Sequence, residues 1–288
     1  MRPTEPASTF RRISNQQKGK TPLTLRFCSL SSGSSGNCYL AGSDRTLVLV
    51  DAGISARQIT ERLKALGLKP EDLSGILITH EHSDHIKGID TLSKKYHLPL
   101  YMNSATEEQL RTLCKNHSEM DIRLFENSGT FRLGDLDVRA FPVSHDAADT
   151  VGFALQKDRA KICTATDTGC VTEEIMEELT EADLMILEAN HDEEILKMGR
   201  YPWFLKQRIL SDFGHLSNEA AGLALAEAVE QDPRPRQVLL AHLSKENNFP
   251  EMAWQTVVNV LESRRIYLND DLRIDLLKRD EMSGVYVL

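Results

Sequence analysis

The sequence lacks several features that would place it in common classes of protein. No apolar stretch approaches the ~18 residues that a membrane-spanning helix needs. The N-terminus has no apolar region of the kind found in secretory signals. The chain has five cysteines, an odd number, and no two of them form a CxxC pair. These absences are typical of free thiols in a reducing cytoplasm, and we expect a cytoplasmic protein without membrane partners.

Basic charge is also scarce. The 34 lysines and arginines are outnumbered by 43 aspartates and glutamates, which gives a net charge of -9 at pH 7. Such a chain has no overall attraction to nucleic acid, although a local basic groove can still form. Residues 1–21 reverse this balance, with five basic residues against Glu5. We expect a flexible tail there, and a basic arm that binds nucleic acid is the alternative.

One stretch of the sequence carries a dense set of groups that can bind a metal ion. His80, His82, Asp84 and His85 follow the apolar run Gly75–Ile78, which is typical of a buried strand. Alternate side chains of an extended chain share a face, so His80 and His82 point the same way. The other two come after the turn and can reach a second point nearby. Imidazole and carboxylate are ligands of zinc and similar ions, so the stretch predicts a metal site.

The motif His-x-His-x-Asp-His resembles that of the metallo-β-lactamase superfamily. Residues 47–53 resemble that fold's strand ending in an Asp-x-Gly turn. The family also needs a lone His, a lone Asp and a last His, each after a strand, and His145, Asp167 and His242 stand at those positions. The resemblance runs from about Leu25 to the C-terminus. It implies an α+β fold, a four-layer αββα sandwich, which periodicity alone cannot establish.

The resemblance also implies a cofactor of two divalent metal ions per chain, with zinc expected and manganese as the alternative. Such a pair can share a hydroxide and clamp the attacking and leaving oxygens. Asp167 would bridge the two ions, and Asp84 is predicted to be both a ligand and a catalytic residue. Asp51 would orient a ligand histidine from behind, or serve only as a turn residue. The implied ligands are His80, His82 and His145 for one ion, and Asp84, His85 and His242 for the other.

Two further residues point to phosphodiester substrates. Glu188 ends a predicted strand, and His215 lies in Gly-His-Leu-Ser before a predicted helix. In the nuclease branches of the superfamily, a Glu and a His in similar settings form a pair beside the metals. There the His protonates the leaving oxygen and the Glu holds its tautomer. A purely local role at the helix N-terminus is the alternative for His215.

Residues 29–38, 214–219 and 242–248 resemble the YycJ/WalJ/VicX group of bacterial exonucleases with this fold. The resemblance implies a 5′-to-3′ DNA exonuclease that uses a metal-bound hydroxide, with DNA expected over RNA. The interval from Asp167 to His242 is too short for an inserted β-CASP domain, so we expect a single catalytic domain over residues 22–288. The alternatives are a small-molecule hydrolase of an ester, thioester, lactone or cyclic phosphodiester, and a non-catalytic metal-stabilised binding module.

Residues 31–37 are rich in glycine and serine and predict a loop. Two interpretations have equal weight: a hairpin turn without function, or a set of backbone N–H and hydroxyl donors that bind an anionic substrate. The substrate-binding candidates are Ser34, Ser35, Asn37 and Asn247. Candidates for a local basic groove are Arg200, Lys206, Arg208 and Lys245. His97 and His117 have polar neighbours and are expected at the surface.

Sequence patterns also predict the main elements. Helical spacing is found at residues 55–66, 85–96, 104–116, 173–179 and 249–264, and in an alanine-rich segment that follows Ser217 and ends before Pro233. Strands are expected at 23–30, 37–41, 98–101, 184–188, 238–241, 272–276 and 285–288, and throughout 122–165.

Overall fold

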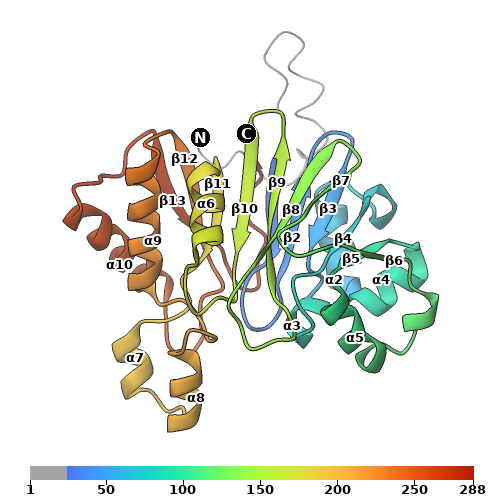
Figure 1. Cartoon of the computed structure of the whole chain (residues 1–288), viewed down its shortest axis with the longest axis horizontal. Helices are drawn as coiled ribbons and strands as arrows, with labels where there is room; N and C mark the ends of the chain where they lie inside the picture. Colours follow the sequence, from blue (N-terminus) through green and yellow to red (C-terminus); the bar gives the residue numbers. More distant parts are fainter. Residues whose placement is uncertain (1–24) are drawn as a thin grey trace.

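The computed structural model describes residues 25–288, and the predicted tail at 1–21 lies outside them. Two seven-stranded sheets stand face to face, and helices cover both outer faces (Figure 1). The first sheet has the order β14 (Tyr286–Val287), β1 (Arg26–Ser31), β2 (Cys38–Gly42), β3 (Leu47–Val50), β4 (Gly75–Leu77), β5 (Leu100–Met102) and β6 (Ile122–Leu124). The second has the order β13 (Leu272–Leu276), β12 (Arg236–Ala241), β11 (Leu184–Glu188), β10 (Ala160–Ala165), β9 (Val151–Lys157), β8 (Leu136–Pro142) and β7 (Thr130–Leu133).

The helices divide between the two sheets. The first sheet carries α2 (Ala56–Ala65), α3 (Ser83–Ile86), α4 (Ile89–Tyr96) and α5 (Ser104–Leu113), with the short turns η1 (Pro70–Asp72) and η2 (His117–Glu119). The second sheet carries α6 (Glu173–Glu181), α9 (Asn218–Gln231) and α10 (Pro250–Ser263). One apolar cluster lies between the sheets and one between each sheet and its helices. Three buried interfaces separate four layers, which confirms the predicted αββα sandwich.

The sheet topology brings the predicted site residues to one edge. Strands β3 and β4 are parallel, and β8, β10, β11 and β12 all run the same way in the second sheet. The carboxyl ends of such strands meet at one edge, where ligands bind in open α/β sheets. The two sheets touch at this edge, since Val151 N donates to Thr79 O and His242 N donates to Ser32 Oγ.

Most predicted elements are confirmed, including the helix starts at Ser55 and Ser217, whose side chains accept from the backbone N–H three residues later. The single helix predicted at 85–96 is wrong. The chain forms α3 and α4 with a break at Gly88, where a Cβ would lie 2.7 Å from Ile54 O. The helix predicted at 104–116 ends at Leu113 and is followed by η2.

Two short helices leave the sandwich altogether. α7 (Glu193–Met198) and α8 (Trp203–Ile209) project from the edge below the second sheet (Figure 1). We call residues 192–214 the α7–α8 arm.

Two sequence expectations concern the chain as a whole. Within residues 25–288, no helix combines the length and apolar character that a membrane crossing requires. All five cysteines are free thiols, and four of them are buried. Burial raises the pKa of the Cys114 thiol to about 11, so this group is a poor nucleophile at neutral pH. The boundary at residue 22 and the single-domain organisation stay predictions.

Candidate metal centre and active site

Three histidines from the two sheets form the first group of candidate ligands. His80 and His82 follow β4, and His145 follows β8. One ring nitrogen of each lies within 4.8 Å of the others. His80 and His145 are buried, and His82 is partly exposed. The structure therefore brings together the three residues that sequence comparison assigned to one ion.

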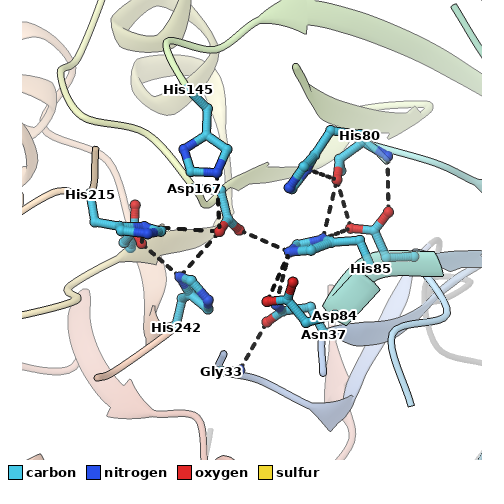
Figure 2. A network of polar contacts seen from close by, with 12 residues as sticks. Gly33, Asn37, His80, Asp84, His85, His145, Asp167, His215 and His242 are labelled. Atoms are coloured by element: carbon cyan, nitrogen blue, oxygen red, sulfur yellow. Dashed lines mark hydrogen bonds and ion pairs between the residues drawn. The ribbon is translucent and has the colours of Figure 1, made fainter. Parts of the chain in front are cut away.

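The second group gathers around Asp167, which lies at the centre of the polar network (Figure 2). His85 Nε2 is 3.3 Å from Asp167 Oδ2, and His242 Nδ1 is 3.5 Å from Asp167 Oδ1. Asp167 also joins His80 and His85 in a set whose ligand atoms lie within 4.8 Å of one another. This central position fits the bridging role predicted for it. Asp84 lies at the margin, with Oδ2 3.8 Å from His85 Nε2.

Three of the site residues have a left-handed backbone conformation. Asp51, Asp167 and His242 follow β3, β10 and β12, and their φ angles are 60°, 56° and 55°. This left-handed conformation is uncommon for residues other than glycine and costs about 1–3 kcal/mol where the surroundings enforce it. It occurs here at the end of three strands that face the same site. Sequence reasoning placed the residues but did not predict the turn.

Asp51 holds His85 from behind. Its Oδ2 accepts from His85 Nδ1 at 2.7 Å, and its two oxygens accept from the Thr79 N–H at 2.9 Å and the Thr79 hydroxyl at 2.8 Å. Burial lowers the pKa of His85, but Asp167 and Asp51 outweigh it and raise the pKa well above its ordinary value. Because Nδ1 is engaged, Nε2 is the nitrogen that points into the site. The predicted orienting contact of Asp51 is therefore present, and it is made to His85.

Glu188 contacts two histidines at once. Its Oε1 accepts from His215 Nδ1 at 2.9 Å and from His242 Nδ1 at 2.7 Å. Its Oε2 accepts from the Thr168 N–H at 2.8 Å and the Leu216 N–H at 3.3 Å. The pairing with His215 was predicted from the sequence. The bond to His242 was missed, because no local pattern indicates that two histidines 27 residues apart in the chain share one carboxylate oxygen.

Glu188 and His215 shift each other's pKa values, and His215 and His242, the two histidine partners of Glu188, lie beside each other in Figure 2. Burial raises the pKa of Glu188, but His215 and His242 outweigh it and lower the pKa to about 2. Burial lowers the pKa of His215, but Glu188 and then Asp167 outweigh it and raise the pKa to about 9. At neutral pH the pair is therefore a carboxylate and an imidazolium. The His215 ring centroid lies 5.1 Å from that of His145 and 5.2 Å from that of His242, so the imidazolium lies beside the candidate ligands.

The site has the donor chemistry of a metal centre. His80 Nε2 and His242 Nε2 are buried and have no hydrogen-bond partner among the described residues. Burial and the neighbouring His85 lower the pKa of His80 well below its ordinary value, so its imidazole is neutral and can donate a lone pair. Unsatisfied buried nitrogens are costly, and a cation bound at each of them removes that cost. The residues present therefore fit divalent ions.

The glycine-serine loop supports the site from beneath. Asn37 is buried, with Nδ2 3.0 Å from His85 Nε2 and Oδ1 accepting from the Gly33 N–H. Asn247 is also buried and packs beside the start of the α7–α8 arm, where its carbonyl accepts from the Asp192 N–H. Asn37 and Asn247 therefore both form hydrogen bonds within the protein, and their predicted contact with substrate stays a prediction. Ser34 and Ser35 are exposed and remain candidates for substrate contact.

The predicted basic groove is only partly present. Lys206 is buried, and its ammonium donates to the carbonyls of Lys197 and Gly199, so it is a structural residue and the prediction of a groove cation is wrong. Arg208 is bonded to Asp146, next to His145. Arg200 and Lys245 are exposed. His97 is exposed as predicted, and His117 is partly exposed and pairs with Glu107 at 3.0 Å.

Comparison with known proteins gives a consistent result. The family model described as Beta-lactamase superfamily domain matches residues 46–243. The chain is 42% identical to exodeoxyribonuclease YycJ of Bacillus anthracis over 242 residues, which cover 84% of this chain and 91% of that protein. It is 42% identical to exodeoxyribonuclease WalJ of Streptococcus pneumoniae, covering 88% and 94% of the two chains. The fold is similar to that of YhfI from Bacillus subtilis, with a TM-score of 0.69 at 18% identity over 92% of this chain and 100% of that one.

Proposed function

Because this chain belongs to the metallo-β-lactamase superfamily, in the group of the exodeoxyribonucleases YycJ and WalJ, we propose that it is a metal-dependent exonuclease that degrades DNA from the 5′ end. The observation that carries the proposal is the Glu188–His215 pair beside the clustered ligands. A site that only hydrolysed activated esters would not need a proton donor for the leaving group.

The metal-binding roles are those that the family resemblance implies, and the clustering of the histidines around Asp167 supports them. His80, His82 and His145 would hold one ion, while His85, His242 and Asp84 would hold the other, with Asp167 between them. Divalent ions at such a site lower the pKa of water to about 7 and stabilise charge on phosphoryl oxygens. We propose zinc as the metal. Manganese is the alternative, since the oxygen ligands Asp84 and Asp167 suit a harder ion.

The chain's own residues supply the proton. His215 carries its second N–H at Nε2, because Nδ1 is engaged by Glu188. A nucleotide 3′-oxygen is a poor leaving group and needs a proton as its bond to phosphorus breaks. Donation from His215 Nε2 meets that need, and ionised Glu188 stabilises the imidazolium before the transfer. General acid catalysis of this kind contributes typically ~10²–10⁴-fold to the rate.

We also propose the cellular compartment of the protein and the type of nucleic acid that it cleaves. Free thiols and the absence of a membrane-crossing helix in residues 25–288 support a cytoplasmic enzyme. The names of the YycJ and WalJ relatives support DNA over RNA as substrate.

The test uses protein reconstituted with zinc or with manganese. Single-stranded DNA and RNA, labelled at the 5′ or the 3′ end, are incubated with it, and generic esters and thioesters are assayed in parallel. We expect mononucleotides to leave the 5′ end of DNA, and activity to vanish on chelation. Rapid hydrolysis of a thioester or lactone with intact DNA would instead establish a small-molecule hydrolase.

A further inference from the structure

The α7–α8 arm concentrates exposed apolar side chains. Ten large hydrophobic residues are exposed in the described part of the chain, and five of them lie within this arm. They are Met198 (79% exposed), Trp203 (65%), Phe204 (72%), Leu210 (37%) and Phe213 (61%). The arm makes up only 23 of the 264 described residues. Clusters of exposed apolar side chains on soluble proteins commonly mark a binding surface.

Specific polar contacts fix the shape of the arm. The Asp192 side chain accepts from the Ile195 N–H and starts α7, and the Lys206 ammonium joins the two helices through the carbonyls of Lys197 and Gly199. Polar bonds to backbone carbonyls thus hold the two short helices together. The apolar side chains are left free to face outward.

Both ends of the arm are fixed to the walls of the candidate active site. At its start, Asp192 N donates to Asn247 O, in the loop that follows His242. At its end, the Ser144 hydroxyl donates to Asp212 O, and Gly214 O accepts from His145 Nδ1 at 3.1 Å. The arm therefore begins and ends at the rim of the candidate active site, and Figure 1 shows it extending away from that edge of the sandwich.

The charges on the arm differ from those of the whole molecule. It contains four acidic residues (Asp192, Glu193, Glu194, Asp212) and four basic ones (Lys197, Arg200, Lys206, Arg208), a net charge of zero, so the remainder of the chain carries the full -9. Lys197 pairs with Glu193 and Glu194, and Arg208 pairs with Asp146. Arg200 is exposed and forms no ion pair with any residue in the described range. It stands three residues before Trp203.

We propose that the α7–α8 arm is a platform for single-stranded nucleic acid, on which Trp203 and Phe204 stack on bases while Arg200 binds the backbone phosphate. The inference rests on the proposed nuclease function and specifies its substrate as an unpaired strand. Aromatic faces stacked on successive bases, with a cation on the phosphates, are how proteins bind single strands without sequence preference. In a duplex the base faces are covered by their neighbours, so this surface selects an unpaired end.

Stacking also resolves a difficulty with charge. Phosphate neutralisation supplies most non-specific affinity for nucleic acid, and a chain with net charge -9 has little of it to offer. Base stacking does not depend on net charge. A neutral aromatic surface at the rim of the site can therefore hold a strand that the rest of the molecule repels.

The first test uses intrinsic fluorescence. The chain has two tryptophans, Trp203 and Trp254, and Trp254 packs against the apolar cluster of the second sheet. In a metal-loaded Trp254→Phe variant, the remaining signal reports Trp203 alone. Addition of an oligothymidylate of about twelve nucleotides with phosphorothioate linkages, which resist cleavage, should quench this signal in a saturable way. Absence of quenching at concentrations that saturate binding would overturn the proposal.

The second test compares matched variants of the metal-loaded enzyme. Trp203→Ala should weaken binding of the same oligonucleotide by roughly 5- to 100-fold, as loss of one stacked base predicts, with a matching rise in KM on single-stranded DNA. Arg200→Ala should lower the slope of log Kd against log salt by about 0.7, the value for one phosphate on a single strand. Tyr267→Ala, which removes an equally exposed aromatic outside the arm, is the control and should bind as wild type does.

The outcomes separate this proposal from the proposed function. If DNA is cleaved but Trp203→Ala binds as tightly as the control, the nuclease stands and the platform is wrong. If the oligonucleotide quenches Trp203 but no DNA is cleaved, the platform stands and the nuclease is wrong. If light scattering shows a dimer that Trp203→Ala converts to a monomer, a second copy of the chain covers the arm and the proposal is overturned.

Discussion

At the scale of single residues, Glu188 and His215 carry the chemistry that distinguishes a nuclease from a generic hydrolase of this fold. Glu188 is fully buried and ionised, and each of its oxygens accepts two hydrogen bonds. His215 is partly exposed, with 21% of its side chain open to solvent. A proton donor that lies beside the candidate ligands and is partly open to solvent can act and then be reprotonated. Two substitutions separate the roles of these residues.

His215→Ala should slow cleavage only of substrates whose leaving group needs a proton. The variant should keep its metals and still cleave bis-nitrophenyl phosphate at a useful rate, because nitrophenolate leaves without protonation. On DNA its rate should fall by roughly 10²-fold or more, because the 3′-oxygen needs the proton. Steady-state rates on both substrates and elemental analysis measure this. His117→Ala, which removes a histidine at the surface, is the control. Equal losses on both substrates with unchanged metal content would mean that His215 supports the site and is not the acid.

Glu188→Gln should be more damaging than loss of its histidine partner. The amide group places an NH₂ opposite either the N–H groups of Thr168 and Leu216 or those of the two histidines, so one pair of hydrogen bonds is lost. Since His242 is a candidate ligand, metal affinity should fall by about 10–100-fold. Activity should fall on both substrates.

Competition with a chelator of known affinity measures the effect of Glu188→Gln on the metal. Wild-type protein and His215→Ala, titrated in parallel, provide the references. Unchanged metal affinity with a loss restricted to DNA would show that Glu188 acts through His215 alone and that its bond to His242 is not needed to hold the metal.

At the scale of elements, the turn after β3 and the loop of candidate ligands after β4 lock together at Gly53. The Gly53 N–H donates to Asn37 O, and the Asn37 N–H donates to Asp84 O. A Cβ on Gly53 would lie 1.6 Å from Asp84 O and 2.6 Å from Asn37 N, so there is no room for a side chain. This contact explains the glycine of the Asp-x-Gly turn by close approach of three backbone segments.

Gly53→Ala should therefore displace the loop that carries Asp84 and His85. We expect a destabilisation of about 3 kcal/mol or more, at the upper end for overpacked sites, and a fall in Tm of roughly 6–12 °C. Gly67→Ala is the comparison, because no atom lies within 4 Å of its Cβ and only its φ of +74° opposes the change. It should cost about 1–2 kcal/mol. Calorimetry of both variants decides, and equal Tm values would contradict the role assigned to Gly53.

The elements also show how far sequence reasoning reaches. Strand ends and N-caps were predicted correctly because apolar runs and capping residues are local signals. That the residues after β4, β8, β10 and β12 share one site was implied by the family resemblance, not by these local signals. The break at Gly88 could not be predicted, since the Gly88 N–H donates to Ala52 O, more than thirty residues away in the chain. The same holds for the buried Lys206 and for the second partner of Glu188, which depend on contacts that form only in the folded chain.

At the scale of the whole molecule, the candidate metal centre joins the two sheets. His80, His82 and His85 come from the loop after β4 of the first sheet, and His145, Asp167 and His242 come from strand ends of the second. One buried ring nitrogen on each side, His80 Nε2 and His242 Nε2, has no hydrogen-bond partner in the described chain. Ions that bind both sets of ligands stabilise the folded state because the unfolded chain cannot present the site.

Metal removal should therefore lower thermal stability as well as activity. A ligand at 1,000 times its Kd contributes about 4 kcal/mol, which corresponds to roughly 8–16 °C in Tm for a protein of this size. Calorimetry of chelated protein, followed by titration with zinc or manganese, should show Tm rising with the logarithm of free metal once its concentration exceeds Kd. Elemental analysis of the saturated protein should give about two ions per chain. Asp167→Ala, which removes the carboxylate between the two groups, should keep about one ion and show a smaller rise. If protein shown by elemental analysis to be free of metal melts at the same temperature as the loaded protein, the two halves are held together without metal and the centre has no part in stability.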